Sequence, residues 1–341
     1  MQARPVRAGP LTPVATIRIG TRGSALAVAQ STTVADRIAA ATGHDVELVR
    51  IKTEGDRSQG TGESLASLGG TGVFASALRE ALLADECDAL VHSLKDLPTA
   101  THPGLVIGAT PGRADARDAL CARDGLTLEG LPQGARVGTG SPRRAAQLLS
   151  RRPDLEVVDI RGNVDTRLGR VGVDLDAVLL SAAGLGRLGR LDAATELLGL
   201  GFWPSAPGQG SLAVEVREGD PDEALARGLA AIEDAETRLV VTAERAVLAG
   251  LEAGCAAPVG ASAVIDAGLL LLSATVYSPD GSRRLSSSHA VSLDDGPLVA
   301  RLADVHEVAG RVVDELLDSG AAESAPLGGG PSGGDPLGGA S

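Results

Sequence analysis

Lys95 and Asp96 are the residues whose types and position most directly indicate chemistry. They follow a strand-like run in Val91-His92-Ser93-Leu94-Lys95-Asp96-Leu97-Pro98. Only two of the 31 basic residues are lysines, so a lysine here indicates a need for a compact ammonium instead of a guanidinium fork. Asp96 is a candidate general acid or base, because neighbouring cations tune its protonation. A solvated Lys–Asp pair at a strand end explains the same residues equally well.

Cys255 is the thiol best placed for chemistry. It stands in a segment punctuated by Gly and Pro, Gly254-Cys255-Ala256-Ala257-Pro258, after a helical stretch. Cys87 and Cys121 lie in apolar surroundings, where a thiol serves packing. Since no histidine is near Cys255 in the sequence, attachment of a prosthetic group explains it as well as nucleophilic turnover does. Three cysteines without a Cys-x-x-Cys pair fit a reducing compartment.

An arginine cluster is the third candidate. Seven arginines and no lysine lie between residues 143 and 170, in a chain of net charge −13. Guanidinium groups bind carboxylates and phosphates bidentately, so the cluster predicts an anion site. Arg161 and Arg167 flank a Gly-Asn turn within it. Any one of these arginines is also explained as a solvated surface charge, and Arg151, Arg152 and Arg170 are expected to be of that kind.

Composition limits the possible partners. Strong acidity argues against nucleic acid or an anionic membrane as the main partner. No apolar stretch approaches the ~20 residues of a membrane helix, and residues 1–15 lack the apolar core of a secretory signal. We therefore expect a cytoplasmic protein. The five histidines show no metal-ligand spacing, so no metal site is expected.

The elements that must position these residues repeat along the chain. Arg18-Ile19-Gly20-Thr21 leads through Ser24 to a helix, and Arg136-Val137-Gly138-Thr139 leads through Ser141 to another. Two buried-strand patterns, 88–93 and 176–181, each end in a serine. Alternating strands and helices predict two lobes with mostly parallel sheets, whose ligand loops face a shared cleft. Each helix start offers an anion site, although each serine is equally explained as a helix N-cap.

The rest of the chain predicts a return to the first lobe and a third unit. A Pro-Gly crossing at 202–210 precedes a strand at 211–216, which we expect to complete the first sheet. A helix from about 234, strands at 260–265 and 269–277, a further strand to about 291 and a helix at 297–317 indicate a small α+β unit. The polar, glycine-rich stretch 53–72 is typical of a lid.

Taken in order, these motifs resemble the porphobilinogen deaminase (hydroxymethylbilane synthase) family over residues 16–318. The motifs that carry the resemblance are the following: Arg18-Ile19-Gly20-Thr21-Arg22-x-Ser24, Val91 to Pro98, Gly138-Thr139-Gly140-Ser141-Pro142-Arg143-Arg144, Arg161-Gly162-Asn163-Val164-x-Thr166-Arg167-Leu168, Ala183-Gly184-Leu185-x-Arg187-Leu188-Gly189, Pro207-Gly208-Gln209-Gly210 and Gly254-Cys255.

The resemblance implies an α/β fold with two lobes like those of type II periplasmic binding proteins and a small α+β C-terminal domain. The first domain would be discontinuous, at 16–111 and 211–230, the second would span 116–207, and the third, with the cofactor cysteine, 234–318. Residues 1–15 and 320–341 would be disordered tails. A monomer without nucleic-acid or membrane partners is expected.

The implied reaction deaminates four porphobilinogen molecules and joins them head to tail into linear hydroxymethylbilane. A dipyrromethane cofactor, bound through a thioether at Cys255, would be the primer. Asp96 would be catalytic, assisting loss of ammonia and stabilising the azafulvene-like cation of the substrate. The residues implied to hold the carboxylates of the cofactor are Ser93, Lys95, Thr139, Ser141, Arg143, Arg144 and Arg187. Those implied to seat the incoming pyrrole are Arg22, Ser24, Gln30, Arg161 and Arg167.

The sequence departs from the family pattern at two places. The lid motif reads Gly69-Gly70-Thr71-Gly72, with Ser67 upstream, where family members often have lysine, and the second turn reads Gly-Thr-Gly-Ser where Gly-Thr-Ser-Ser is common. A non-catalytic two-lobed anion-binding protein would account for the paired turns and the arginines, but not for Lys95-Asp96 or the third unit. A cysteine-dependent transferase unrelated to pyrroles is a further alternative.

Overall fold

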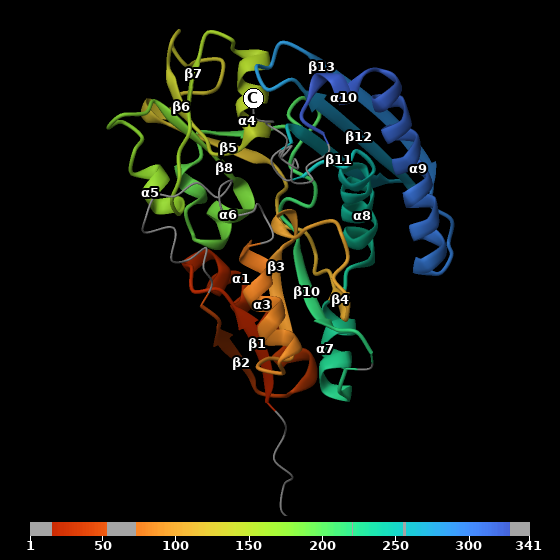
Figure 1. Cartoon of the computed structure of the whole chain (residues 1–341). Helices are drawn as coiled ribbons and strands as arrows, with labels where there is room; N and C mark the ends of the chain where they lie inside the picture. The colour runs from red at the N-terminus through yellow and green to blue at the C-terminus, as the bar shows by residue number, and fades with distance from the viewer. Residues whose placement is uncertain (1–15, 53–72, 220, 255–256, 328–341) are drawn as a thin grey trace, which may run out of the picture.

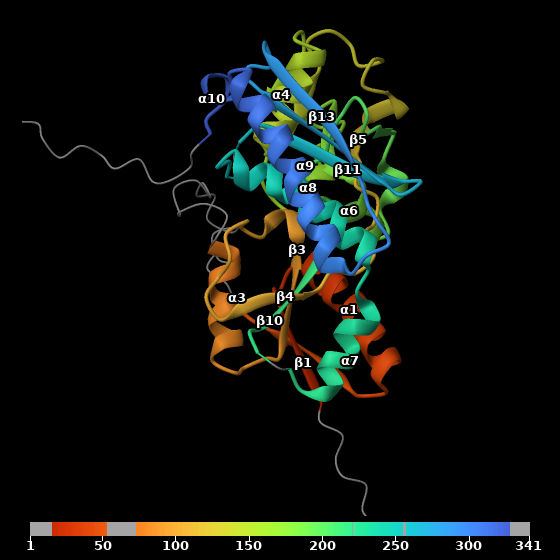
Figure 2. The ribbon, with the colours of Figure 1, turned by 90° about the vertical axis from the view of Figure 1, so that its right-hand side faces the viewer.

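The computed structural model describes residues 16–52, 73–219, 221–254 and 257–327. Within them the chain forms three β-sheets, each packed with helices (Figure 1). The first sheet lies at the lower end of the molecule, and the other two lie above it in both views (Figures 1 and 2). This arrangement confirms the predicted α/β class with two lobes and a third unit.

The first sheet has the strand order β2-β1-β3-β10-β4. Its strands are β1 (Ile17–Thr21), β2 (Val46–Arg50), β3 (Ala89–Ser93), β4 (Leu105–Ala109) and β10 (Leu212–Arg217). Helices α1 (Ala25–Thr42), α3 (Val73–Leu83) and α7 (Glu223–Ile232) pack on it. Apolar residues of the strands, such as Ile19 and Val214, pack against Val34 and Ile38 of α1 to form the core of this lobe.

The second sheet has the order β7-β6-β8-β5-β9. Its strands are β5 (Asp118–Ala122), β6 (Arg136–Gly138), β7 (Glu156–Val158), β8 (Ala177–Ser181) and β9 (Glu196–Leu198). Its helices are α4 (Pro142–Arg151), α5 (Val164–Leu168) and α6 (Ala182–Arg187), with short 3₁₀ turns η2 (Arg123–Gly125) and η3 (Leu191–Ala193). The buried Trp203, from the crossing back to the first lobe, packs in its core.

Each of these two sheets contains one strand that runs against the other four. β10 pairs antiparallel with β3 and β4, and β5 pairs antiparallel with β8 and β9, whereas the remaining pairs are parallel. β5 is the first strand after the chain leaves the first sheet, and β10 is the first strand after it returns. The first lobe is therefore discontinuous in sequence, as the Pro-Gly crossing predicted.

The repeated junction packs in the same way in both lobes. A Cβ at Gly20, in β1, would lie 2.7 Å from Leu90 Cδ2, and one at Gly138, in β6, would lie 2.6 Å from Leu175 Cδ1. Because real Cβ contacts are essentially never this short, the glycine in each lobe leaves room for a leucine side chain to pack against the strand. The serines that follow are N-caps: Ser24 Oγ accepts from the Ala27 amide, and Ser141 Oγ accepts from the Arg144 amide. Capping thus explains both serines locally.

The third unit is an antiparallel sheet, β11-β12-β13, covered by long helices. Its elements are β11 (Val259–Asp266), β12 (Leu269–Tyr277), β13 (Arg284–Ser292), α8 (Ala235–Gly250), α9 (Leu298–Asp318) and α10 (Ala321–Ser324). The predicted strands and helices agree with these bounds. The expectation of a disordered tail from residue 320 is wrong for its first residues, because Ala321 and Ala325 are buried in the core of this unit.

Glu244 of α8 joins the third unit to both crossings between the lobes. Its side chain is fully buried, and its Oε1 accepts from Arg113 Nη1 (2.8 Å) and from the Ala263 amide (2.9 Å). Its Oε2 accepts from Arg113 Nη2 (2.9 Å) and from the Gly208 amide (2.8 Å). A buried carboxylate must find such partners. These contacts tie β11, the outgoing crossing and the returning crossing to one side chain.

The third unit also touches each lobe directly. In the turn between β12 and β13, a Cβ at Gly281 would lie 2.4 Å from the Ser150 amide nitrogen of α4, so backbone meets backbone there. On the first lobe, Arg245 of α8 donates to the carbonyls of Leu94, Leu97 and Pro98, at 3.1, 2.8 and 2.7 Å. A pocket of about 430 Å³ lies beside this contact, between α8, α9 and β4.

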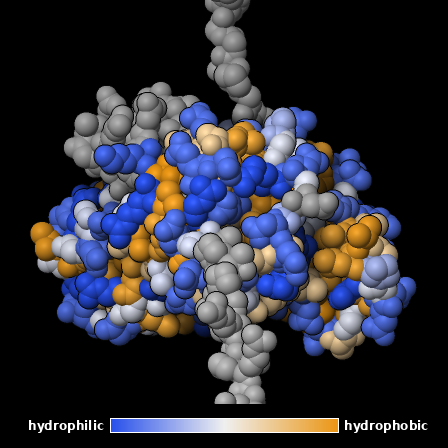
Figure 3. Space-filling model, turned by 90° about the horizontal axis from the view of Figure 1, so that it is seen from below, coloured by the Kyte–Doolittle hydropathy of each residue, from blue (hydrophilic) through white to orange (hydrophobic). Residues whose placement is uncertain are grey.

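The face of the molecule seen from below is mostly hydrophilic. Hydrophilic side chains cover most of this face, and hydrophobic ones form separate patches (Figure 3). Exposed large apolar residues come from different elements, such as Leu83 in α3 and Val106 in β4. Among the described residues, none of the helices combines the length and the apolar character that crossing a bilayer requires.

Candidate active site

The predicted catalytic pair lies in a short turn at the end of β3. The 3₁₀ turn η1 (Leu94–Asp96) follows Ser93 directly, and the Leu97 amide closes it by donating to the Leu94 carbonyl at 3.2 Å. The three carbonyl contacts from Arg245 hold this turn from the side of the third unit. Lys95 is partly buried, whereas Asp96 is exposed. The turn therefore presents the Asp96 carboxylate to solvent beside an anchored ammonium.

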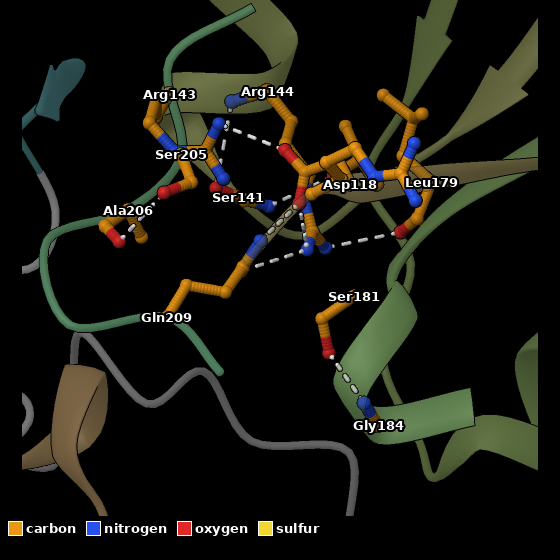
Figure 4. A network of polar contacts seen from close by, with 12 residues as sticks. Asp118, Ser141, Arg143, Arg144, Leu179, Ser181, Gly184, Ser205, Ala206 and Gln209 are labelled. Carbon is orange, nitrogen blue, oxygen red and sulfur yellow. Dashed lines mark hydrogen bonds and ion pairs between the residues drawn. The ribbon is translucent and has the colours of Figure 1, made fainter. Parts of the chain in front are cut away.

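Arg143 and Arg144 enter the site from the first turn of α4, and both pair with Asp118. Arg143 Nη1 lies 2.9 Å from Asp118 Oδ2, and Arg144 Nη2 lies 2.7 Å from Oδ1. The indole N–H of Trp203 donates to Oδ2 at 2.8 Å. Figure 4 shows the Asp118 carboxylate between the two guanidinium groups. Asp118 itself is fully buried at the start of β5.

Gln209 connects this second-lobe cluster to the first lobe. The residue lies on the returning crossing, and its side chain reaches the Asp118 carboxylate (Figure 4). Its amide oxygen accepts from Lys95 Nζ at 3.2 Å and from Arg144 Nη2 at 3.4 Å. The structure thus brings together Lys95, Arg143 and Arg144, three of the residues that the family resemblance implies for cofactor binding.

The electrostatics of the cluster follow from burial and from its charges. Burial lowers the pKa of Lys95 to about 8, although Asp96 and Asp118 act in the other direction. Burial also lowers the pKa of Arg143. For Asp118, burial alone would raise the pKa, but Arg143 and Arg144 outweigh it and hold the pKa far below the ordinary range. Three cations and one buried carboxylate leave net positive charge at the junction of the lobes, before Asp96 is counted.

Three further predicted arginines lie around the cluster. Arg167, on α5, donates from Nε to the Gly162 carbonyl at 2.8 Å, and its pKa is lowered by burial and by the charges of Arg144 and Arg161. Arg161 is exposed and pairs with Asp159 at 3.4 Å. Arg187, at the end of α6, donates to the Gly210 carbonyl at 2.7 Å, and burial lowers its pKa. Carbonyl contacts orient the guanidiniums of Arg167 and Arg187 without neutralising them.

The remaining predicted residues lie at the ends of strands in both lobes. Gln30, buried on α1, donates to Ser93 Oγ at 2.8 Å, which joins a residue expected to bind substrate with one expected to bind cofactor. Thr139 Oγ1 accepts from the Ser141 amide at 3.2 Å, within the turn before α4. Arg22 and Ser24 lie in the equivalent turn before α1, and both are partly buried.

Some of the predicted features cannot be placed. Cys255 and the stretch 53–72, with Ser67 and Thr71, lie outside the described residues. The described neighbours of Cys255, Gly254 and Ala257, connect α8 to β11, and the Ala257 amide donates to the Gly254 carbonyl at 2.9 Å. Burial raises the pKa of both Cys87 and Cys121 to about 11, so these two remain thiols at neutral pH, as expected of packing residues.

Asp118 and the contacts of Gln209 were missed from the sequence. A carboxylate at the head of the buried run Asp118–Ala122 is a usable signal, because a buried charge requires a partner. The identity of the partners is not visible in the sequence, since they stand 25 and 26 residues away on α4. Arg152 was expected to be a solvated surface charge, but its guanidinium donates hydrogen bonds to the carbonyls of Leu128 and Leu131 at 2.8 and 2.9 Å.

Similarity to known proteins covers almost the whole chain. Residues 17–224 match the family model "Porphobilinogen deaminase, dipyromethane cofactor binding domain", and residues 238–297 match "Porphobilinogen deaminase, C-terminal domain". A porphobilinogen deaminase of Leifsonia xyli subsp. xyli is 64% identical over 92% of this chain and 95% of its own length. One from Cutibacterium acnes is 54% identical over 91% of this chain and 97% of its own length.

Among solved structures, the methionine-binding protein MetQ is 14% identical, with a TM-score of 0.42 over 65% of this chain and 92% of that protein. The two family models together span the lobes that carry Lys95, Asp96 and the arginines, and most of the third unit. The high identity to the bacterial relatives extends over nearly the whole chain. On this basis, the chain belongs to the porphobilinogen deaminase family.

Proposed function

We propose that this chain deaminates porphobilinogen and joins four of the resulting units into hydroxymethylbilane, as a transferase of tetrapyrrole biosynthesis. In each cycle a C–N bond of porphobilinogen breaks with release of ammonia, a C–C bond to the growing chain forms, and a ring proton leaves. Water finally releases the product. The observation that carries the proposal is the convergence of Lys95 and Asp96, at the end of β3, with Arg143 and Arg144, at the start of α4.

The residues present fit a dipyrromethane cofactor, whose pyrroles carry carboxylates. Arg143 Nε is buried and has no hydrogen-bond partner among the described residues. Arg167 and Arg187 donate to carbonyls in the contacts described above, so their charge remains available to an anion. When bound, the cofactor supplies the pyrrole to which the first substrate unit is joined. We assign its carboxylates to Lys95, Arg143, Arg144 and Arg187, with Ser93, Thr139 and Ser141 as hydroxyl donors.

In this proposal Asp96 moves the protons. Its carboxylate is exposed, so it reaches substrate without first being desolvated, and Lys95 lies beside it in the same turn. A charged carboxylate accepts hydrogen bonds from pyrrole N–H groups and takes up the proton lost after each C–C bond forms. The substrate carboxylates are assigned to Arg161 and Arg167 of the second lobe and to Arg22, Ser24 and Gln30 of the first.

We further propose the domain limits 16–111 with 211–230, 116–207 and 234–318, since each range contains one complete sheet. Cys255 would then lie in the third domain and hold the cofactor by a thioether. A cytoplasmic monomer without a nucleic-acid partner is supported by the net charge of −13, which repels nucleic acid. The buried free thiols Cys87 and Cys121 fit a reducing compartment.

Intact-protein mass tests the cofactor assignment. Freshly purified, active protein should exceed its sequence mass by a two-pyrrole adduct, and Cys255→Ala should remove the excess. Cys121→Ala is the matched control, because this buried thiol has a raised pKa and should leave the adduct in place. An unmodified mass in active protein would contradict the assignment.

Turnover of the variant Asp96→Asn tests the catalytic role. We expect the adduct to be retained while ammonia release falls by about 100-fold or more, the range typical of a lost acid–base group. Asp192→Asn is the control, since Asp192 is an exposed aspartate in the similar 3₁₀ turn η3 and should leave turnover unchanged. Near-normal turnover of Asp96→Asn would remove Asp96 from this role.

A further inference from the structure

Asp118 and Lys95 belong to different lobes but are joined by a single side chain. Asp118 opens β5 in the second sheet, and Lys95 follows β3 in the first. Gln209, on the crossing that returns to the first lobe, is 1% exposed and touches both: its Nε2 lies 2.8 Å from Asp118 Oδ1, and its Oε1 lies 3.2 Å from Lys95 Nζ. A path of two hydrogen bonds therefore runs from a buried carboxylate to the ammonium beside Asp96.

The amide of Gln209 can have only one orientation in this setting. Its nitrogen faces two acceptors, the Asp118 carboxylate and the Ala116 carbonyl, each at 2.8 Å. Its oxygen faces two cations, Lys95 and Arg144. A reversed amide would place N–H groups against cations and the oxygen against a carboxylate, and each of these contacts is repulsive. Asp118 is thus the group that aims the amide oxygen at Lys95.

The charge on Lys95 depends on the same carboxylate. Among the described residues, the groups that face Lys95 include Asp96 on its own turn, Arg143 and Arg144 on α4, Asp118 on β5 and the Gln209 amide on the crossing. Burial and the two guanidiniums favour the neutral amine, whereas the two carboxylates favour the ammonium. Without the charge of Asp118, Asp96 would be left as the one carboxylate among these groups that opposes Arg143 and Arg144.

We propose that Asp118 is a positioning residue for the reaction: by orienting the Gln209 amide and offsetting Arg143 and Arg144, it keeps Lys95 charged and fixed beside Asp96. The inference rests on the proposed function, in which Lys95 binds a carboxylate. Asp118 itself reaches neither substrate nor cofactor in this role, because it is fully buried and its described contacts are with protein groups. It acts through Gln209 and the arginines.

The composition of the chain allows a direct test. Because Lys52 and Lys95 are the only lysines, protein labelled with ¹³C-lysine gives two Cε signals, whose shifts report protonation of each amine. Lys52 is exposed and is the internal reference. The protein groups alone lower the pKa of Lys95 to about 8, and in the holoprotein we expect a higher midpoint, because a cofactor carboxylate adds a negative charge beside the amine. Asp118→Asn should lower this midpoint by about one unit, the effect of losing a nearby opposite charge.

Two further variants complete the experiment. Gln209→Met removes the amide but leaves the ion pairs of Asp118, so it should also lower the Lys95 midpoint, because the ammonium loses a hydrogen bond. Asp115→Asn is the control: Asp115 pairs with Arg117 at the surface, and its loss should leave Lys95 unchanged. In activity assays, the alkaline limb of kcat/KM should move to lower pH with Lys95, since the charged form is then lost earlier.

The outcomes separate this inference from the proposed function. A Lys95 midpoint that stays at the wild-type value in folded Asp118→Asn or in Gln209→Met overturns the positioning role. If Asp118→Asn does not fold, Gln209→Met decides alone. The NMR titration needs no turnover, so a wild-type chain that fails to consume porphobilinogen would refute the proposed function while the titration still tests the role of Asp118.

Discussion

At the scale of single residues, the site cations differ in how they are neutralised. Arg143 and Arg144 share the buried carboxylate of Asp118, whereas Arg167 and Arg187 are oriented by carbonyls. A carbonyl fixes the geometry of a guanidinium but leaves its charge to be met by a ligand. The structure therefore distinguishes two cations that share a protein carboxylate from two cations whose charge is left for a ligand.

Replacing Arg167 should improve stability while weakening substrate binding. Arg167 is repelled by Arg144 and Arg161, so Arg167→Gln should raise the free energy of unfolding by about 0.5–1 kcal/mol, a size usual for a relieved functional site. It should raise KM for porphobilinogen by about tenfold, equivalent to about 1.4 kcal/mol. Thermal denaturation and steady-state kinetics measure the two effects.

Arg170→Gln is the matched control for this variant. Arg170 lies on the same segment but pairs with Asp174, so its loss should change KM little and stability by less than about 0.5 kcal/mol. If Arg167→Gln lowered stability and left KM unchanged, Arg167 would be a scaffold residue.

The residues found from the sequence are those whose type is unusual for this chain. Lys95 stands out because arginine is otherwise the basic residue, and the structure places it in the cluster. Asp118 was missed because aspartate is common in the chain and its importance comes from partners that are remote in sequence. The interpretation of Ser24 and Ser141 as helix N-caps was right about their local contacts.

At the scale of elements, the β12–β13 turn is a contact that a single methyl group should disrupt. Gly281 has φ of 72°, and a Cβ there would meet the α4 backbone at 2.4 Å. Gly281→Ala should therefore cost the left-handed penalty of about 1–2 kcal/mol and a further ~1–3 kcal/mol of overpacking. Because α4 carries Arg143 and Arg144, kcat/KM should fall as well.

Gly268→Ala isolates the steric part of that prediction. Gly268, in the turn between β11 and β12, has φ of 78° but no atom within 4 Å of its Cβ position. Its replacement should lower Tm only by the backbone penalty. Equal losses in the two variants would mean that the contact with α4 has no energetic weight.

The contacts of Glu215 link three elements of the first lobe, and their contribution to stability should depend on pH in the acid range. Burial alone would raise the pKa of Glu215 on β10, but His92 on β3 and Arg79 on α3 outweigh it and lower the pKa to about 2. A depressed carboxyl pKa stabilises the fold above the unfolded value of about 4.3 and loses that effect as pH falls toward 2. The stability advantage of wild type over Glu215→Gln should shrink across this window in acid titrations. A constant difference would contradict it.

Element prediction succeeded where the signal is local. The strand predicted at 269–277 agrees with β12, and the two serine-ended runs stop at Ser93 and Ser181 as expected. The strands β7 and β9 are only three residues long, which is too short for a recognisable alternation of apolar and polar residues. Their conformation is defined by backbone pairing with β6 and β5. The prediction of disorder from residue 320 was wrong for α10, because Ala321 and Ala325 pack into the core of the third unit although the segment has few apolar residues.

At the scale of the whole molecule, Glu244 holds the three units together. It is fully buried and pairs with Arg113 while bonding amides of the returning crossing and of β11. Glu244→Gln should destabilise the protein by about 3 kcal/mol, because it leaves a buried guanidinium without its partner. Glu223→Gln is the control, since Glu223 forms an exposed i,i+4 pair that is worth less than about 0.5 kcal/mol. Denaturant midpoints measure both, and equal values would deny Glu244 this role.

The position of β10 has a consequence for synthesis of the chain on the ribosome. β3 and β4 are made early, but the strand between them is made only after the whole second lobe has emerged. Until then the nascent first lobe has unpaired strand edges, which invite association with other chains. The second lobe is continuous and can fold first, and its folding brings the two crossings close enough to reduce the entropy lost when β10 inserts. Of the two lobes, the one that is translated first is therefore expected to be completed second.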